Sequence, residues 1–197
     1  MRLLFFTDTH GNERYFQEIM QKSKDADILV CLGDFTIFEN DIDKILRKLD
    51  SIGKPVIILH GNHETSSSVI AASNGLANIH FIHKTYAVFG DIVFFGFGGG
   101  GFVLSDQRFD IAAAVFMKEF EKMNGKKLIV VTHAPPYGTS LDDLGYHVGL
   151  KNITEFIRKY QPLMAVSGHI HETFGKEERI GKTLVFNPGP KGRIIDV

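Results

Sequence analysis

The sequence predicts an α/β fold in which helices cover buried strands. Three observations support this prediction. Short runs of apolar, β-branched and aromatic residues alternate with longer amphipathic stretches, and most of these runs are apolar at successive positions. Continuous apolar runs are typical of strands that are buried on both faces of a layered α/β protein. The last part of the chain instead contains short strand-like segments joined by tight turns, which predicts antiparallel pairing at the end of the sheet.

The predicted elements follow one another in a regular order. Strands are predicted at Leu3–Phe6, Ile28–Leu32, Val56–Leu59, Ile92–Phe95, Leu128–Thr132 and Leu163–Val166. Helices are predicted at Glu13–Ser23, Asp41–Leu49, Ser66–Ala72, Ile111–Met123 and Leu150–Tyr160. The antiparallel strands are predicted at Thr173–Ile180, Thr183–Asn187 and Arg193–Val197. Apolar residues recur at helical spacing in the last helix and predict one core-facing side, formed by Ile153, Phe156, Ile157 and Tyr160.

Length and composition indicate one domain spanning residues 1–197, without a linker or an internal repeat. Hydrophobic residues make up 44% and charged residues 23%, which is typical of globular proteins. Lys and Arg number 22, Asp and Glu number 23, and no basic run is present. The charge therefore gives no strong sign of nucleic-acid binding. A homo-oligomer is compatible with these features.

No apolar segment approaches the ~20 residues that cross a bilayer, so no membrane association is expected. The N-terminal stretch has neither the apolar length nor the cleavage site of a signal peptide. Cys31 is the only cysteine and lies in an apolar run, so we expect a buried thiol and no intramolecular disulfide. Together these features predict a cytoplasmic protein.

Side chains that can bind metals follow five of the predicted strands, at the point where each strand ends. In an open α/β sheet, the carboxyl ends of the strands form the crevice in which ligands bind. We therefore expect these side chains to meet at one edge. They are Asp8, His10, Asp34, Asn62, His133, His169 and His171.

The types of these donors indicate the chemistry. Two carboxylates, one amide and four imidazoles without a thiolate suit Mn, Fe, Zn or Co. They do not suit a Cys-rich structural zinc site or an all-oxygen calcium site. Seven donors are too many for one tetrahedral ion but suffice for two ions if a carboxylate bridges them. Two divalent ions would retain positive charge, which attracts a phosphate and stabilises its transition state.

The order of the motifs resembles the calcineurin-like metallophosphoesterase superfamily, and in particular a small branch with phosphodiesterase members. The motifs are Asp8-x-His10, Gly33-Asp34, Gly61-Asn62-His63-Glu64, His133 and Gly168-His169-x-His171. One such motif occurs by chance in many proteins, but five in this order, each after a strand-like run, are specific. The resemblance extends from Asp8 to Gly189. It implies a four-layered α/β/β/α sandwich of two mixed sheets flanked by helices.

The resemblance also implies a binuclear site with two divalent or trivalent transition-metal ions. These are Mn, Fe, Ni, Co or Zn, with Mn favoured. The first ion would be held by Asp8, His10, Asp34 and His171. The second would be held by Asp34, Asn62, His133 and His169, so that Asp34 bridges the two. A hydroxide shared by the ions would attack the phosphorus.

The catalytic residue that the resemblance implies is His63, which would donate a proton or a hydrogen bond to the leaving group. Many members of the superfamily carry an acidic residue three positions after the bridging Asp, and this residue orients the histidine. Here that position is Ile37, so the orienting group must come from elsewhere or be absent.

The predicted function is hydrolysis of a small phosphodiester, with a cyclic nucleotide as one candidate substrate. The chain is short, and it has His60 where protein-phosphatase-like members have an Arg that grips a phosphomonoester. The alternatives are a phosphomonoesterase or nuclease of the same superfamily, and a non-catalytic scaffold with the same fold. A binuclear amidohydrolase is a further alternative, but it usually needs a barrel of ~250 residues.

Four other features are not part of the predicted metal site. Two of them have both a structural and a substrate-related interpretation, and the other two have a structural interpretation only. The glycine run Gly98–Gly101 is either a loop near the substrate or a simple bend. His60 is either structural or adjacent to the substrate, and His147 is expected in a solvated loop. Glu64 is interpreted as a helix-start residue.

Overall fold

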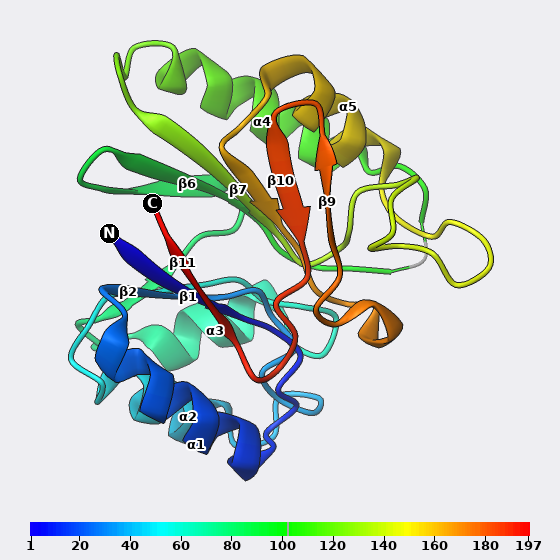
Figure 1. Ribbon diagram of the computed structural model, residues 1–197. Helices are drawn as coiled ribbons and strands as arrows, with labels where there is room; N and C mark the ends of the chain where they lie inside the picture. Colours follow the sequence, from blue (N-terminus) through cyan, green and yellow to red (C-terminus); the bar gives the residue numbers. More distant parts are fainter. Residues whose placement is uncertain (102) are drawn as a thin grey trace.

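The computed structural model describes residues 1–101 and 103–197. Within this part of the chain, two mixed sheets pack face to face and helices cover their outer faces (Figure 1). The five-stranded sheet has the order β11 (Arg193–Asp196), β1 (Arg2–Phe6), β2 (Ile28–Cys31), β3 (Val56–Ile58) and β4 (Ile79–Phe81). The six-stranded sheet has the order β5 (Thr85–Phe89), β6 (Ile92–Phe97), β7 (Lys127–Thr132), β8 (Met164–Val166), β10 (Thr183–Phe186) and β9 (Glu177–Ile180).

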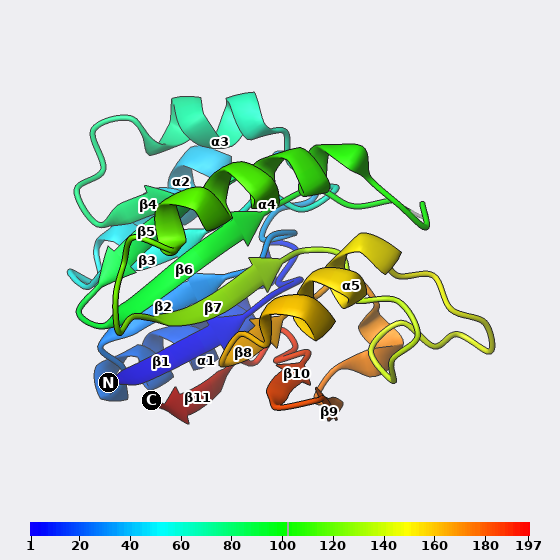
Figure 2. The same ribbon diagram turned by 90° about the horizontal axis from the view of Figure 1, so that it is seen from above.

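The helices divide between the two outer faces (Figure 1), and Figure 2 looks down on one of these faces. The five-stranded sheet is covered by α1 (Glu13–Lys22), α2 (Ile42–Asp50) and α3 (Ser66–Ser73). The six-stranded sheet is covered by α4 (Gln107–Phe120) and α5 (Lys151–Tyr160). Two short 3-10 turns complete the chain, η1 (Ser23–Asp25) and η2 (His171–Thr173). The arrangement is the predicted α/β/β/α sandwich of two mixed sheets, and the predicted fold class is confirmed.

Three apolar layers hold the sandwich together, and each central strand contributes to two of them. On β1, Leu3 and Phe5 belong to the core between the sheets, whereas Leu4 and Phe6 belong to the core beneath the helices. Successive side chains of a strand point to opposite faces, so a strand between two layers must be apolar at every position. This requirement explains the continuous apolar runs in the sequence. The buried thiol of Cys31 packs in the helix-side core, as expected.

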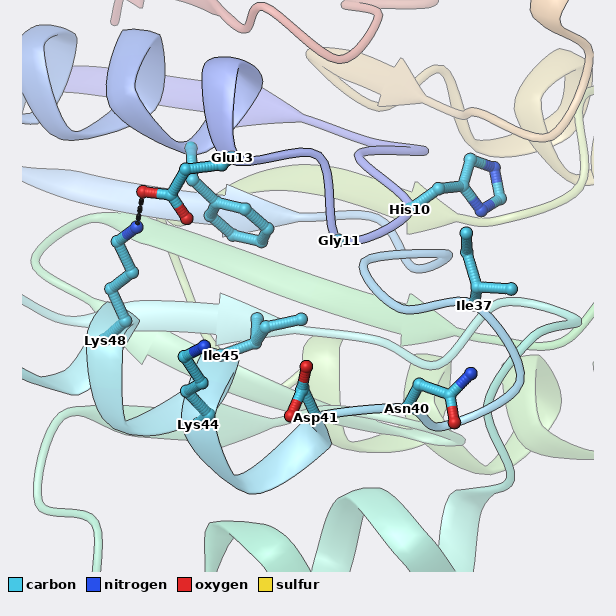
Figure 3. A pocket seen from close by; sticks show the side chains of 10 residues that line it. His10, Gly11, Glu13, Ile37, Asn40, Asp41, Lys44, Ile45 and Lys48 are labelled. Carbon is cyan, nitrogen blue, oxygen red and sulfur yellow. Dashed lines mark hydrogen bonds and ion pairs between the residues drawn. The ribbon is translucent and has the colours of Figure 1, made fainter.

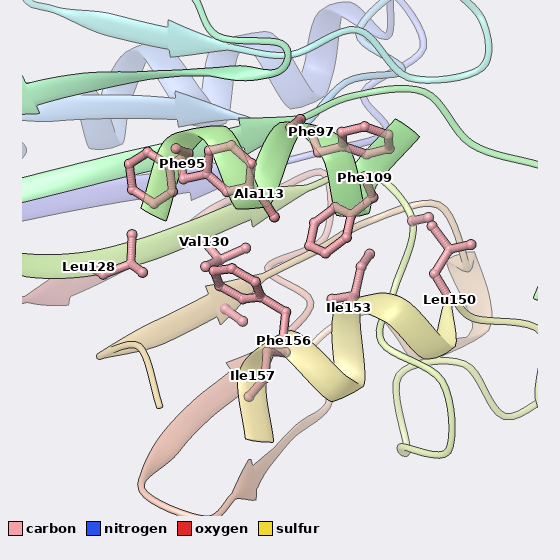
Figure 4. Packing of buried hydrophobic residues seen from close by; sticks show 14 of the residues in the cluster. Phe95, Phe97, Phe109, Ala113, Leu128, Val130, Leu150, Ile153, Phe156 and Ile157 are labelled. Carbon is pink, nitrogen blue, oxygen red and sulfur yellow. The ribbon is translucent and has the colours of Figure 1, made fainter. Parts of the chain in front are cut away.

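The core beneath α4 and α5 is rich in aromatic rings (Figure 4). Phe95 of β6 stacks on Phe116 of α4 with ring centroids 4.5 Å apart, and Phe109 meets Phe156 of α5 edge to face. The predicted face of α5 packs here: Ile153, Phe156 and Ile157 are buried, and Tyr160 is partly buried against the same cluster. That prediction is confirmed.

The strand directions bring the ends of many strands to one edge. Strands β1 to β4 pair in parallel, and so do β6, β7, β8 and β10. Antiparallel pairing joins β10 to β9, as predicted for the end of the chain. The last strand, β11, pairs antiparallel with β1 and therefore lies in the other sheet. The loops after β1, β2, β3, β7 and β8 consequently meet at a common edge of the sandwich.

Several element boundaries differ from the sequence predictions. The sequence pattern does not predict β4 and β5, whose side chains are mostly partly exposed. Helix α4 begins at Gln107 rather than Ile111, because the Asp106 side chain accepts a hydrogen bond from the Arg108 amide and caps the helix. The strand predicted from Thr173 begins only at Glu177, since the preceding residues form η2 and a turn. Among the described residues, no helix has the length and apolar character needed to cross a membrane.

Candidate metal centre

All of the predicted metal-binding residues lie in the loops that meet at the common edge. Each loop follows a buried strand, and the two sheets both contribute. The candidate ligand atoms form three groups, and within each group they lie within 4.8 Å of one another. The groups are Asp8, His10 and His171; His10, Asp34 and His63; and Asp34, His133 and His169. Asn62 joins the last group through its side-chain oxygen, which lies 3.1 Å from His133 Nε2.

The backbone of these loops adopts the left-handed region at four of the predicted ligand residues. The φ angles of Asp8, His10, Asp34 and His169 are 53°, 45°, 50° and 71°. This region is unfavourable for residues other than glycine, and such strain clusters at functional sites where the surroundings hold it in place. Here the Asp8 amide donates to the Gly33 carbonyl at 3.0 Å, and the His10 amide donates to the Asp34 carbonyl at 2.9 Å. The loops after β1 and β2 therefore fix each other.

In the first cluster, Asp8, His10 and His171 converge. His171 Nε2 lies 3.2 Å from His10 Nε2 and 3.5 Å from Asp8 Oδ1. The Nδ1–H of His10 donates to the Thr36 carbonyl at 3.2 Å, which leaves the lone pair of Nε2 directed at the cluster. Asp8 Oδ2 accepts hydrogen bonds from Thr7 Oγ1 and the His169 amide. Its other oxygen, Oδ1, is buried and accepts no hydrogen bond from the described residues.

In the second cluster, Asp34, Asn62 and His133 converge. The Nδ1–H of His133 donates to the Leu32 carbonyl at 2.8 Å, so Nε2 faces Asp34 Oδ2 at 3.4 Å and Asn62 Oδ1 at 3.1 Å. The imidazole lone pair and the amide oxygen are both acceptors. Their approach requires a positive group between them, which is either a proton on His133 or a metal ion.

Asp34 lies between the two clusters. Its carboxylate belongs to one group with His10 and to another with His133 and His169. The side chain is buried, and the His63 amide donates to Oδ1 at 2.9 Å. This position fits a carboxylate that bridges two ions. The approach of Asn62 Oδ1 to His133 Nε2 in the second cluster and the buried Asp8 Oδ1, 3.5 Å from His171 Nε2, in the first are the two observations that fit a metal at each place.

Electrostatics couple Asp34 and His133 in the metal-free protein. Burial raises the pKa of Asp34, but the charge and the hydrogen bond of His133 outweigh it and hold that pKa below its usual range. Burial lowers the pKa of His133, but the Asp34 carboxylate outweighs it and raises that pKa to about 9. Burial, reinforced by the charge of His133, lowers the pKa of His169 to about 4. At neutral pH the metal-free centre thus holds a His133–Asp34 ion pair beside a neutral His169.

Glu64 has a role that the sequence interpretation missed. Its side chain is only 4% exposed and accepts hydrogen bonds from the amides of Asp34, Thr36 and Gly61 and from Thr36 Oγ1, at 2.7 to 3.0 Å. The helix-start interpretation is wrong, because Thr65 caps α3 by accepting from the Ser68 amide. Glu64 instead ties the loop after β2 to the loop after β3. Position in sequence gives no signal of such a contact.

His63 lies beside the first cluster. Its ring is 4.7 Å from the His10 ring and 4.6 Å from the Phe38 ring, centroid to centroid. Within the described residues, His63 Nδ1 is buried and has no hydrogen-bond partner. Ile37, at the position of the acidic residue expected from related proteins, is 47% exposed. The contact that restricts the His63 ring is therefore aromatic packing against Phe38, not a carboxylate.

The glycine run lies against the second cluster. A Cβ atom on Gly100 would lie 3.0 Å from the His133 ring and 3.5 Å from the His169 ring. The Gly98 amide donates to His83 Nδ1 at 3.0 Å, and the Gly99 amide donates to the His60 carbonyl at 2.8 Å. Of the two interpretations, a loop close to the site is thus the one that the geometry supports.

Four other histidines lie outside the clusters, His60, His80, His83 and His147. The His60 ring packs on His83 with centroids 4.5 Å apart. Burial lowers the pKa of His83 to about 4, so both rings are neutral structural groups beside the glycine run. His147 is exposed, as expected for a solvated loop, and its Nδ1–H donates to the buried Asp142 carboxylate at 2.9 Å. It fixes its own loop.

Comparisons with known proteins agree with the motifs and the fold. The sequence model of the calcineurin-like phosphoesterase family matches residues 1–173. An uncharacterized protein of Methanocaldococcus jannaschii is 29% identical over 206 residues, covering 99% of this chain and 91% of that protein. A dimetal phosphatase from Danio rerio superposes with a TM-score of 0.68 at 13% identity, covering 95% of this chain and 86% of that one. An archaeal phosphodiesterase superposes with a TM-score of 0.56 at 16% identity, covering 96% and 84%.

Proposed function

Because the chain belongs to the calcineurin-like phosphoesterase family, we propose that it hydrolyses a small phosphodiester with two transition-metal ions. The family is metal-dependent and acts on phosphoesters, and the described residues include matching clusters of candidate ligands. The observation that carries the binuclear proposal is the position of Asp34, whose carboxylate belongs to the ligand groups on both sides. One carboxylate that serves two clusters is the arrangement that a pair of ions requires.

The first ion would be held by Asp8, His10, Asp34 and His171, and the second by Asp34, Asn62, His133 and His169. The mixed oxygen and nitrogen set suits Mn, Fe, Ni, Co or Zn, and among these we propose Mn. When bound, such ions polarise a phosphoryl oxygen and lower the pKa of water, which supplies the nucleophile at neutral pH.

The residues of the chain itself hold these groups in place and assist the leaving group. Hydrogen bonds from His10 and His133 to backbone carbonyls fix Nδ1 of each ring as a donor, so that Nε2 is the nitrogen that a metal would bind, with His133 losing its second proton as the metal binds. His63 would donate a proton or a hydrogen bond to the leaving oxygen. Its packing between His10 and Phe38 restricts the ring in a position beside both clusters.

One observation favours a diester over a monoester. His60 replaces the Arg that grips a phosphomonoester in protein-phosphatase-like relatives, and its ring packs on His83. The solved structures with this fold include both an archaeal phosphodiesterase and a dimetal phosphatase, so they do not separate the two ester classes. We also propose a cytoplasmic location, which suits the free and buried thiol of Cys31.

A paired assay tests the proposal. Metal-stripped protein is supplied with each of the five metals and given bis(p-nitrophenyl) phosphate or p-nitrophenyl phosphate. We expect no turnover without metal, restoration by Mn²⁺, and faster turnover of the diester. Faster turnover of the monoester would overturn the diester preference. Folded, metal-loaded protein that turns over neither ester would instead support a non-catalytic scaffold.

A further inference from the structure

A cavity of about 250 Å³ lies beside the candidate metal centre, between the start of α1 and the segment that leads into α2 (Figure 3). Its residues near the metal centre are His10, Gly11 and Ile37, and those further away are Asn40, Asp41 and Lys44. The volume is slightly below the ~300–1,000 Å³ of pockets for drug-sized ligands. It suits one planar ring system rather than a polymer.

The cavity and the metal centre share a wall. His10 lines the cavity, and its Nε2 atom lies 3.2 Å from His171 in the first cluster. Ile37 lines the cavity as well, and the next residue, Phe38, packs on His63. A substrate whose phosphate lies at the metal centre would therefore have the cavity beside it.

Apolar side chains form part of the cavity surface. Phe16 and Ile45 belong to the core beneath the helices and line the cavity from that side. Ile37 is 47% exposed, so part of its apolar surface is accessible to a group that enters the cavity. A flat, weakly polar group would cover these side chains.

The polar side chains of the cavity have free hydrogen-bonding capacity. Within the described residues, the side chains of Asn40, Asp41 and Lys44 form no hydrogen bond or ion pair. They offer an amide, a carboxylate and an ammonium group, which together can donate and accept. Glu13 and Lys48 pair with each other at the other end of the cavity (Figure 3). The two carboxylates balance the two ammonium groups, so the cavity does not favour a polyanion.

The segment that carries these groups is held in a fixed shape. Phe38, Glu39 and Asp41 have φ angles of 47°, 65° and 57°, all in the left-handed region. The Glu39 carboxylate accepts from the Thr65 amide at 2.7 Å, and the Glu39 amide donates to Thr36 Oγ1 at 3.1 Å. A strained segment anchored at Glu39 is typical of a ligand-binding loop whose polar groups are preorganised.

From these features we propose that the cavity binds the nucleobase of a nucleotide phosphodiester whose phosphate lies at the metal centre. A nucleobase is flat, is neutral, and presents both donors and acceptors at its edge. It would cover Ile37, and its edge would meet Asn40, Asp41 and Lys44. This inference rests on the proposed function and extends it by naming the substrate class.

The test uses two chromogenic diesters that release the same p-nitrophenol. Thymidine 5′-(p-nitrophenyl) phosphate carries a nucleoside, whereas methyl p-nitrophenyl phosphate does not. The wild type should show a higher kcat/KM for the nucleoside ester. The ratio of the two kcat/KM values should fall about tenfold in Asn40→Ala and in Lys44→Ala, because each loses a hydrogen bond to the base. The matched controls Asn124→Ala and Lys118→Ala, exposed residues after and on α4, should keep the wild-type ratio.

An unchanged ratio in both cavity variants, or no preference in the wild type, would overturn the inference while leaving the proposed function intact. If metal-loaded protein turned over neither ester, the proposed function would fail instead. NMR then decides the binding question. A shift of the Asn40 side-chain amide signal on titration with thymidine supports the nucleobase site. No shift at millimolar thymidine, or a shift with inorganic phosphate alone, would overturn it.

Discussion

Asp34 illustrates how one side chain joins two clusters at the residue scale. It follows β2, which is the central strand of its sheet and pairs in parallel with β1 and β3. Its backbone amide donates to the buried Glu64 carboxylate at 3.0 Å. The His63 amide binds one carboxylate oxygen, and His133 lies 3.4 Å from the other. With backbone and side chain both fixed, the carboxylate needs no rearrangement to contact two ions.

Substitution of this carboxylate should therefore abolish both metal binding and activity. We expect Asp34→Asn to reduce kcat/KM by more than about a hundredfold. Mutation of a residue that only hydrogen-bonds to a metal ligand already lowers metal affinity or activity by about 10–100-fold. Metal content after dialysis, measured by mass spectrometry, should fall below that of the wild type. Asp43→Asn, an exposed position on α2, serves as the control. Full metal content in Asp34→Asn would contradict the bridging role.

The proposed acid, His63, should behave differently from the metal ligands. We expect His63→Ala to retain the wild-type metal content and to lower kcat by about 10²–10⁴-fold with a diester of a poorly acidic alcohol. The loss should be smaller with p-nitrophenyl esters, because p-nitrophenolate leaves without protonation. An equal loss of kcat with both leaving groups would show that His63 does not act by donating a proton.

Metal binding should depend on pH because it competes with a proton on His133. Asp34 raises the pKa of His133 to about 9 in the metal-free protein, and a metal ligand must be the neutral imidazole. Below pH 9 the apparent affinity for Mn²⁺ should fall by about tenfold per pH unit for each proton displaced. Titration calorimetry at several pH values, in buffers that differ in ionisation enthalpy, measures this. An affinity that stays constant from pH 6.5 to 8.5 would contradict the ion pair.

The same shift affects the stability of the metal-free protein with a definite sign. Because the pKa of His133 is higher in the folded than in the unfolded protein, the protonated form stabilises the fold. This contribution is fully present below the ordinary histidine pKa of about 6.5 and is lost as the pH rises through about 9.

At the scale of secondary-structure elements, the loops after parallel strands carry the site, and they are tied together by buried polar contacts. Glu64 joins the loops after β2 and β3, whereas the His169 amide joins the loop after β8 to the loop after β1 by donating to the Asp8 carboxylate. These contacts hold each loop in its strained conformation. The loops are therefore coupled rather than independent.

Removal of the Glu64 carboxylate should lower stability strongly. In Glu64→Ala, buried donors of three residues lose their acceptor, at about 1–3 kcal/mol for each unsatisfied group. We expect the free energy of unfolding to fall by at least about 3 kcal/mol in urea denaturation. The control Glu119→Ala removes an exposed ion pair with Lys122 and should change the free energy of unfolding by less than about 1 kcal/mol. Equal effects of the two substitutions would show that Glu64 does not hold the loops.

The elements differ in how far the sequence predicts them. The central strands are predictable because two buried faces demand apolar residues at every position, as in β2. In β4 and β5 most side chains are partly or fully exposed, so neither strand has the buried faces that produce a continuous apolar run. The ligand residues are found from their position after apolar runs. The Glu64 contacts, the packing of Phe38 on His63 and the cavity depend on distant loops meeting, which no local pattern encodes.

At the scale of the whole molecule, the two sheets each supply part of the candidate centre. Asp8, His10, Asp34 and Asn62 follow strands of one sheet, whereas His133, His169 and His171 follow strands of the other. The packing of the sheets through their shared apolar core thus sets the distances between ligands. The centre exists only when the sandwich is assembled, so the fold and the chemistry depend on the same contacts between sheets.

The central claim is that this edge of the sandwich holds two metal ions bridged by Asp34. Anomalous X-ray diffraction from crystals of the Mn²⁺-loaded protein, recorded on both sides of the manganese absorption edge, tests it most directly. Two bridged ions should give two anomalous peaks about 3.5–4 Å apart with the Asp34 carboxylate between them. A single peak, or peaks that contact none of the seven ligand residues, would contradict it.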